Sequence, residues 1–233
     1  MKVGIMQPYF FPYLGYWQLI NAVDTFVILD DVNYIKKGFI NSNSILVNNE
    51  AYKFTIPLEK ASQNKLINET KLNFSQKDKE KFLKTIYISY KRSPFFDAVY
   101  PVIEHSILYD NSDLTEYIKY SIDQTKLYLG ITTDIVYSSK IKKDNTLKAQ
   151  ERIIEINKKL GASIYINANG GRSLYSKLDF ERNKIELKFI QMERVVYEQL
   201  KNKFVPNLSI IDVLMFNSID SIKQLLDQYI LYT

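Results

Sequence analysis

The chain has 233 residues, of which 46% are hydrophobic and 24% charged, a balance typical of a folded globular protein and not of a disordered segment. It contains no cysteine and one histidine, which excludes disulfides, a thiolate nucleophile and metal sites built from several His or Cys ligands. The formal net charge of +5 is a mild excess spread along the chain, and a coding bias toward Lys, Ile, Asn, Tyr and Phe accounts for part of it. We therefore do not expect nucleic acid to be the main ligand.

No apolar run approaches the ~20 residues that a membrane-spanning helix needs, and the chain begins without a charged-then-apolar leader. We therefore expect a soluble, cytoplasmic protein with no membrane span. The sequence contains no internal repeat and no low-complexity linker, which favours a single α/β domain over residues 1–233.

The first part of the chain predicts a βαβ unit followed by a hairpin. Apolar runs at residues 3–6 and 25–29 flank an amphipathic stretch at residues 13–22, which indicates two parallel neighbouring strands joined by a right-handed helical crossover. Residues 45–56 predict a β-hairpin that turns at Asn48 and Asn49, because asparagine tolerates the positive φ of a tight turn. We expect this hairpin to add to the sheet as an antiparallel pair.

The rest of the chain alternates between helical and extended patterns. Apolar residues recur with a helical period through residues 77–129, which predicts a helical middle segment. Together the patterns predict an α/β fold with a mostly parallel sheet, flanking helices, a β-hairpin addition and this helical insertion. Strands are expected at residues 131–137, 163–166 and 185–190, the last being the final strand, and helices at residues 146–160, ending at Gly161, 210–216 and 219–229.

The loop after the first strand, residues 7–16, is rich in aromatic residues and proline. Open α/β sheets bind ligands at the carboxyl ends of their strands, where aromatic faces can stack on a base or a sugar ring. The alternative is that these side chains cap the hydrophobic core. Tyr13 and Tyr16 also occupy the positions of the two histidines in the HxGH turn of nucleotidylyl transferases, although neutral tyrosines fill that role only weakly.

Two aspartates, Asp30 and Asp31, follow the second expected strand, so their carboxylates should lie at its carboxyl end beside the aromatic loop. Paired carboxylates can hold Mg²⁺ on a nucleotide diphosphate, or one of them can act as a general base. The alternative is a simple turn or a helix cap. The polar side chains that follow indicate a site for a phosphorylated, hydroxyl-rich ligand: Tyr34, Lys36, Lys37, Asn41 and Asn43.

A second polar cluster follows the strand expected at residues 163–166. Gly170 and Gly171 allow backbone amides to turn toward an anion, and Arg172 can bind a phosphate or a carboxylate through two hydrogen bonds. Most Gly-Gly pairs form only turns, so the position at the carboxyl edge is what favours a binding role. The cluster comprises Asn167, Asn169, Gly170, Gly171, Arg172 and Tyr175.

Two other features are interpreted as structural. His105 lies within an expected helix, with no serine or acid motif around it. Ser209 is expected to cap the helix at residues 210–216, with Asp212 in the capping-box position.

Three blocks of the sequence, residues 6–43, 167–175 and 208–217, resemble the WbqC-like family, and the resemblance extends over nearly the full length. Members of that family occur among genes for bacterial O-antigen and other surface polysaccharides, and some are proposed to be glycine transferases. One departure is that Ser42 and Ser44 stand where the family commonly has arginine, which removes two guanidinium groups from that stretch. The matching positions are Gln7, Pro8, Tyr9, Pro12, Gly15, Tyr16, Asp30, Asp31, Tyr34, Lys37, Asn41, Asn43, Gly170, Gly171, Tyr175, Ser209 and Asp212.

The resemblance implies a transferase that moves glycine or another aminoacyl group to a nucleotide-linked amino sugar, with a carrier protein or pathway protein as a candidate partner. The paired aspartates make Mg²⁺ a candidate cofactor. Asp30 or Asp31 would be the catalytic base. One alternative is a non-catalytic protein that binds sugar nucleotides, and another is a metal-dependent glycosyltransferase. The residues expected to bind substrate are Gln7, Tyr9, Tyr13, Gly15, Tyr16, Tyr34, Lys37, Asn41, Asn43, Asn169, Gly170, Gly171, Arg172 and Tyr175.

Overall fold

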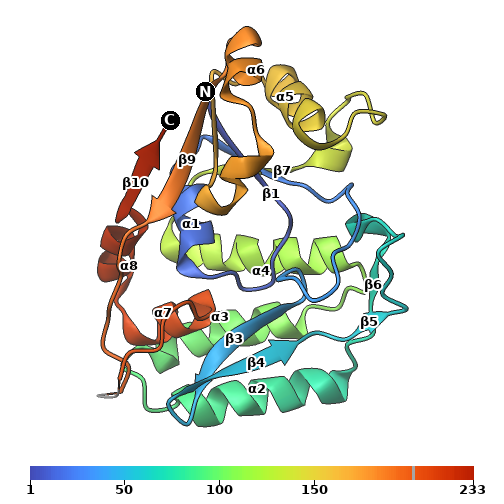
Figure 1. The fold of residues 1–233 in the computed structure, drawn as a ribbon. Coiled ribbons are helices and arrows are strands. Elements are labelled where there is room, and N and C mark those ends of the chain that lie inside the picture. The colour runs from blue at the N-terminus through green and yellow to red at the C-terminus, as the bar shows by residue number, and fades with distance from the viewer. Residues whose placement is uncertain (201–202) are drawn as a thin grey trace.

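A twisted six-stranded sheet with helices on both faces forms the centre of the upper part of the molecule in Figure 1. The structure is a computed structural model and describes residues 1–200 and 203–233. The strand order is β10-β9-β8-β1-β2-β7, and every neighbouring pair is parallel except β9 with β10. This confirms the mostly parallel α/β sheet. The strands are β1 (Lys2–Met6), β2 (Thr25–Ile28), β7 (Asp134–Tyr137), β8 (Ile164–Ala168), β9 (Glu186–Met192) and β10 (Tyr229–Tyr232).

The predicted βαβ unit is present, because β1 and β2 pair in parallel and helix α1 (Leu14–Asn21) connects them. From β1 the chain builds outward to β2 and β7, then returns to the other side of β1 to form β8 and β9. The sheet therefore has a topological switch point between β1 and β8. At such a point the connections leave toward opposite faces of the sheet, which opens a crevice at the carboxyl ends of the strands.

The two faces of the sheet have separate hydrophobic clusters. Val3 and Ile5 of β1 pack with residues of α5 (Ala149–Leu160) and α6 (Lys177–Arg182) on one face. Phe26 of β2 packs on the other face, with Trp17 of α1. Helix α8 (Ile219–Leu226) lies beside α1 on this second face (Figure 1). Within the described part of the chain, no helix combines the length and the apolarity that crossing a bilayer would require.

The helical middle segment is confirmed and lies below the central sheet in Figure 1. The hairpin at residues 45–56 also forms, and Asn48 and Asn49 adopt φ values of 51° and 67° at its turn. The prediction that it adds to the main sheet is wrong, because it makes a separate two-stranded sheet whose buried side packs against the middle helices and α7 (Ile210–Phe216). The elements of this region are β3 (Ser42–Val47), β4 (Glu50–Thr55), β5 (Leu58–Glu59), η1 (Ile67–Glu69), β6 (Lys71–Leu72), α2 (Gln76–Tyr90), α3 (Phe96–Leu108) and α4 (Leu114–Leu129).

The C-terminal end also differs from expectation. The helix expected over residues 219–229 ends at Leu226, and β9 is not the final strand, because β10 pairs antiparallel with it at the edge of the sheet. A helix would leave that edge of β9 without backbone partners, and the ladder with β10 supplies them. Short 3₁₀ turns complete the fold at η2 (Ser138–Lys140) and η3 (Asn169–Leu174).

Three segments that are far apart in the sequence meet at the carbonyl oxygen of Phe11. That oxygen accepts hydrogen bonds from Asn43 Nδ2 at 2.6 Å and from Ser209 Oγ at 2.8 Å. The backbone N–H of Ser209 donates to Ser44 O at 2.8 Å, and that of Ile210 donates to Pro12 O at 2.9 Å. We call Phe11, Asn43 and Ser209 the Phe11 clasp. It joins the aromatic loop to β3 and to the start of α7.

We expect Ser209 of the clasp to contribute more to stability than a serine that only caps a helix. Ser209→Ala removes the bond to Phe11 and also the cap that Ser209 Oγ supplies to Ile211 N–H, so unfolding should become easier by about 2–3 kcal/mol. Ser218 caps α8 in the same way through Ser221 N–H, and Ser218→Ala should lower stability by about 1 kcal/mol. Urea unfolding of both variants measures the difference, and equal losses would contradict a special role for the clasp.

Candidate functional site

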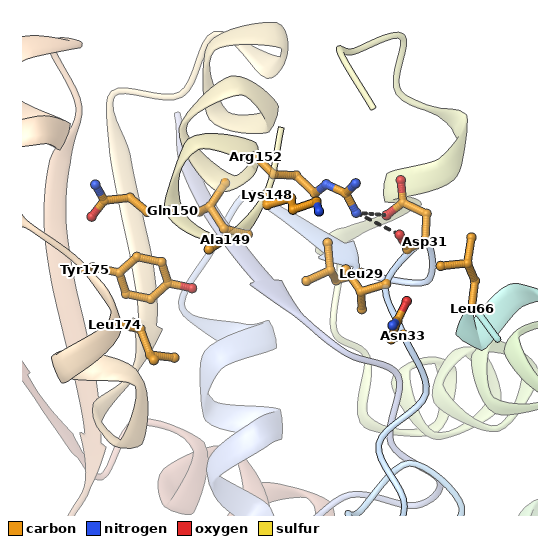
Figure 2. Close-up of a pocket in the computed structure, with 12 residues that line it drawn as sticks. Leu29, Asp31, Asn33, Leu66, Lys148, Ala149, Gln150, Arg152, Leu174 and Tyr175 are labelled. Atoms are coloured by element: carbon orange, nitrogen blue, oxygen red, sulfur yellow. Dashed lines mark hydrogen bonds and ion pairs between the residues drawn. The ribbon is translucent and has the colours of Figure 1, made fainter. Parts of the chain in front are cut away.

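A pocket of about 470 Å³ lies at the carboxyl edge of the sheet, beside the switch point (Figure 2). The segment after β2, the first turn of α5 and the segment after β8 form most of it. Figure 2 shows Tyr175 and Leu174 facing Leu66 and Asp31 across the pocket. We call it the switch-point pocket. It is lined by Leu29, Asp31, Val32, Asn33, Leu66, Lys148, Ala149, Gln150, Arg152, Ile153, Leu174 and Tyr175.

The lining of this pocket combines apolar side chains with charged ones. Leu29, Leu66 and Leu174, with the ring of Tyr175, supply apolar surface. The exposed Lys148 lies at the start of α5, whose first backbone amides receive no side-chain cap. A helix N-terminus carries partial positive charge, so a lysine ammonium and this terminus together favour an anion. The pocket therefore suits a ligand with a flat apolar part and an anionic part.

Asp31 lines the pocket as an ion-paired carboxylate. Its Oδ2 lies 2.6 Å from Lys143 Nζ, its Oδ1 accepts a hydrogen bond from Ser138 Oγ at 2.7 Å, and Arg152 Nη1 is 4.0 Å from Oδ1. Burial alone would raise the pKa of Asp31, but the hydrogen bonds and positive charges of these partners outweigh burial and lower the pKa below its usual value. Asp31 is therefore ionised at neutral pH.

Two other polar side chains of the lining hold the protein together. Arg152 donates to the carbonyl oxygens of Leu147 at 2.9 Å, Asp31 at 2.7 Å and Asn145 at 3.0 Å. Gln150 accepts from the backbone N–H of Ser176 and donates to Asp179 Oδ2. These bonds join the segments around the pocket and set its shape.

Asp30 does not line the pocket. Its side chain is buried, with 2% exposed, and it accepts hydrogen bonds from Ser139 N at 2.9 Å, Ser139 Oγ at 2.6 Å and Asn68 Nδ2 at 3.3 Å. Asp30 therefore ties the end of β2 to η1 and η2. Because its oxygens are covered by N–H and O–H donors and Asp31 is paired with Lys143, the two carboxylates do not fit Mg²⁺, which needs free oxygen ligands. Within residues 1–200 and 203–233, no three or more His, Cys, Asp or Glu side chains are grouped to hold a metal ion.

Four of the residues expected to bind substrate line a second, smaller hollow of about 210 Å³ beside the first turn of α1. A Cβ at Gly15 would lie 2.6 Å from the ring of Tyr13, so a larger residue here would displace that ring. Burial raises the pKa of Tyr13 and of Tyr16, so both stay neutral phenols at neutral pH, and a phenol cannot carry the positive charge of the histidine donors in an HxGH turn. The four are Tyr13, Gly15, Asn169 and Gly170.

Four other expected binding residues are buried and bonded within the protein. Tyr16 donates to Gln7 O at 2.9 Å, and Tyr34 donates to Asn41 Oδ1 at 2.8 Å. Asn41 donates in turn to Ile56 O at 2.7 Å, and Asn43 belongs to the Phe11 clasp. These side chains hold the loops that follow β1 and β2.

The remaining expected residues are dispersed around these loops, and the aromatic loop largely caps the core. Phe10 and Phe11 are fully buried, as expected if this loop caps the hydrophobic core. Tyr9 packs against Tyr16 and Phe39, and Lys37 is exposed in a turn with φ 61°. These remaining residues, which line neither hollow, are Gln7, Tyr9, Lys37, Gly171 and Arg172.

Residues 208–217, the third block that resembles the family, contribute to a buried hydrogen-bond network. Ser209 caps α7 as expected, but Asp212 does not complete a capping box. Its carboxylate instead accepts hydrogen bonds from Tyr90 Oη at 2.8 Å, Tyr197 Oη at 2.7 Å and Gln199 Nε2 at 2.6 Å. Burial raises the pKa of Asp212. This network ties α7 to α2 and to the segment after β9.

Sequence reasoning missed several residues of the switch-point pocket, Lys148 and Asn33 among them. One signal was available, since the connection from β7 to α5 also begins at the carboxyl end of a strand. Lys148 lies at the end of that connection. Leu66 carried no such signal, because it reaches the pocket from the region between two short strands that no pattern indicated.

Because Asp31 is ion-paired, we expect its contribution to the free energy of unfolding to depend on pH. A carboxyl whose pKa is lowered in the folded state stabilises the protein above its unfolded pKa of ~4, and that contribution is lost as the pH falls through the folded pKa. Asp31→Asn should therefore lower the free energy of unfolding at pH 7, and the difference from the parent should shrink below about pH 5. Urea unfolding at a series of pH values measures this, and a difference that stays unchanged down to pH 3 would contradict it.

Comparisons with known proteins place the chain in a family. The model of the WbqC-like protein family matches residues 7–224. The chain is also similar to the "Uncharacterized protein Rv1507c" of Mycobacterium tuberculosis (strain ATCC 25618 / H37Rv), with 26% identity over 219 residues that cover 93% of each chain. No solved structure gives a significant match. Because the family model spans most of its length, the chain belongs to the WbqC-like protein family.

Proposed function

We propose that this chain is a transferase of bacterial surface-polysaccharide biosynthesis, and that its switch-point pocket binds a nucleotide-linked amino sugar. The observation that carries the proposal is the pocket itself, which lies where open α/β sheets bind nucleotides and combines apolar walls with the exposed Lys148. The chain belongs to the WbqC-like family. This supports the proposal, because the resemblance implies a role in surface-polysaccharide biosynthesis.

In this proposal the base lies against Leu174 and the ring of Tyr175, on the side of the pocket opposite Asp31 and Leu66 (Figure 2). The phosphates face Lys148 and the uncapped first turn of α5. The sugar then extends toward Asp31 and Asn33, which supply polar groups for its hydroxyl or amino substituents. The apolar side chains thus contact the base, Lys148 contacts the phosphates, and Asp31 and Asn33 contact the sugar.

The proposed reaction is the transfer of glycine or another aminoacyl group to the sugar amine. The amine nitrogen attacks the activated carbonyl carbon, a C–N bond forms, and the bond from that carbon to its activating group breaks with departure of the group. The attacking amine loses one proton as the bond forms, and Asp31 is the carboxylate of the pocket that can accept it. We assign this role to Asp31, which lines the pocket, and not to Asp30, which is buried outside its lining.

One observation favours a second candidate, a sugar-nucleotide binding protein without turnover. Both oxygens of Asp31 already have partners, and its lowered pKa makes it a weak base. A binding protein needs the same apolar walls and the same lysine, but it needs no proton acceptor. The two candidates differ only in whether transfer follows binding.

Binding is tested by thermal unfolding with UDP-, GDP-, CMP- and dTDP-linked sugars, amino sugars included. A ligand that binds the folded state raises the unfolding temperature, and one of these should do so. Lys148→Ala should weaken that ligand about tenfold, because a charge-assisted contact to phosphate is lost. Lys158→Ala, at the opposite end of the same helix, is the matched control and should leave affinity unchanged. No shift with any of the four classes would count against a nucleotide pocket.

Catalysis is tested with isotope-labelled glycine, supplied as the free acid with ATP, as a thioester or on tRNA. The transferase proposal expects label on the sugar that gave the thermal shift, and at least tenfold slower labelling by Asp31→Asn, because the proton acceptor is lost. The same variant should still bind the sugar nucleotide in the thermal assay. Binding without label from any donor would favour the non-catalytic candidate.

A further inference from the structure

Strand β4 has a free edge. In the hairpin β4 pairs with β3 alone, and the backbone N–H of Ile56 donates to Asn41 O on that side at 2.8 Å. Hydrogen bonding alternates along an antiparallel ladder, so the even-numbered residues of β4 bond to β3. The N–H and C=O groups of Ala51, Lys53 and Thr55 therefore point away from β3, toward the other edge.

The chain itself already uses the end of this edge for strand-like pairing. Pro57 continues the odd-numbered series, so its carbonyl group also points away from β3. Its carbonyl oxygen accepts a hydrogen bond from Asn73 N–H at 2.9 Å. The preceding residues of that segment form β6, which pairs with β5. The chain then turns at Ser75 into α2. Among the described residues, the edge at residues 51–55 is left without a strand partner.

A groove of about 210 Å³ runs between this free edge and α2, which lie side by side in Figure 1. Its apolar surface comes from Tyr52, Phe54, Phe74 and Phe82, and the rings of Phe54 and Phe82 lie 4.6 Å apart. This volume is below the roughly 300–1,000 Å³ typical of small-molecule sites. It is better matched to individual side chains that project from an extended backbone.

The charges beside the groove are mainly positive. Lys53 and Lys81 line it and are exposed. Asp78 also lines it, but its carboxylate accepts hydrogen bonds from the N–H and the hydroxyl of Ser75 in the capping box of α2. The lining therefore carries two positive charges and one negative charge, and the two exposed lysines favour an acidic ligand.

We propose that the β4–α2 groove binds an extended segment of a partner protein by strand addition, with apolar side chains alternating with acidic ones. The outward groups of residues 51–55 supply backbone hydrogen bonds, the aromatic surface takes the apolar side chains, and the two lysines attract the acidic ones. Because α2 forms the other wall, the added segment lies between β4 and this helix.

The experiment uses the full chain and a displayed library of random peptides. Selection should yield a consensus of alternating apolar and acidic residues, and a synthetic consensus peptide should bind the full chain in a fluorescence anisotropy assay. Lys53→Pro removes an outward N–H and leaves the ladder with β3 intact, so it should weaken the peptide about tenfold. Lys53→Ala keeps that N–H and loses only the charge, so it should weaken the peptide about threefold.

Three outcomes would overturn the proposal: no consensus, a consensus peptide that binds Lys53→Pro as well as the parent, or concentration-dependent dimers that Lys53→Pro abolishes. The last would identify a second copy as the occupant. Circular dichroism and urea unfolding check that the proline variant is folded. Lys81→Glu on the opposite wall is an independent variant, and it should weaken an acidic peptide with a loss that shrinks at high salt.

Discussion

The carbonyl oxygen of Phe11 is the point on which the lower and upper parts of this molecule depend. Phe11 adopts a φ of 43°, a left-handed conformation that costs a bulky residue about 1–2 kcal/mol, and its ring is fully buried. Hydrogen bonds from Asn43 and Ser209 hold it there. Because Phe11 precedes α1, while Asn43 lies in β3 and Ser209 caps α7, one constraint aligns the central sheet with the hairpin and the C-terminal helices.

Many side chains of the aromatic loop and of the polar run that follows also hold the backbone in place and do not face a ligand. A loop at the carboxyl edge of a sheet must satisfy its backbone groups, and here side-chain amides and hydroxyls do so. Tyr16, Tyr34 and Asn41 are bonded to backbone or to one another and are not free for a ligand. The ligand-sized space lies instead on the α5 side, where Arg152 and Lys143 hold the segment around Asp31.

Much of the architecture could be predicted from local patterns. The βαβ start, the helical middle segment and the Asn48–Asn49 turn follow from hydrophobic period and turn chemistry, which act between neighbouring residues. The placement of the hairpin and the strand at residues 229–232 could not be predicted in this way. Both depend on which distant backbone edge or helix face is available, and no local pattern carries that information.

The sequence by itself determined that this is a mostly parallel α/β protein of the WbqC-like family, and that Asp31 and Tyr175 lie in segments that follow strands of the sheet. Hydrophobic periodicity and contiguous blocks of sequence are enough to establish these features. Only the tertiary structure decided that the neighbouring Asp30 is covered by Ser139 and Asn68 while Asp31 reaches the pocket. Successive side chains at the end of a strand point in different directions, and the partners that cover one of them come from segments that only folding brings together.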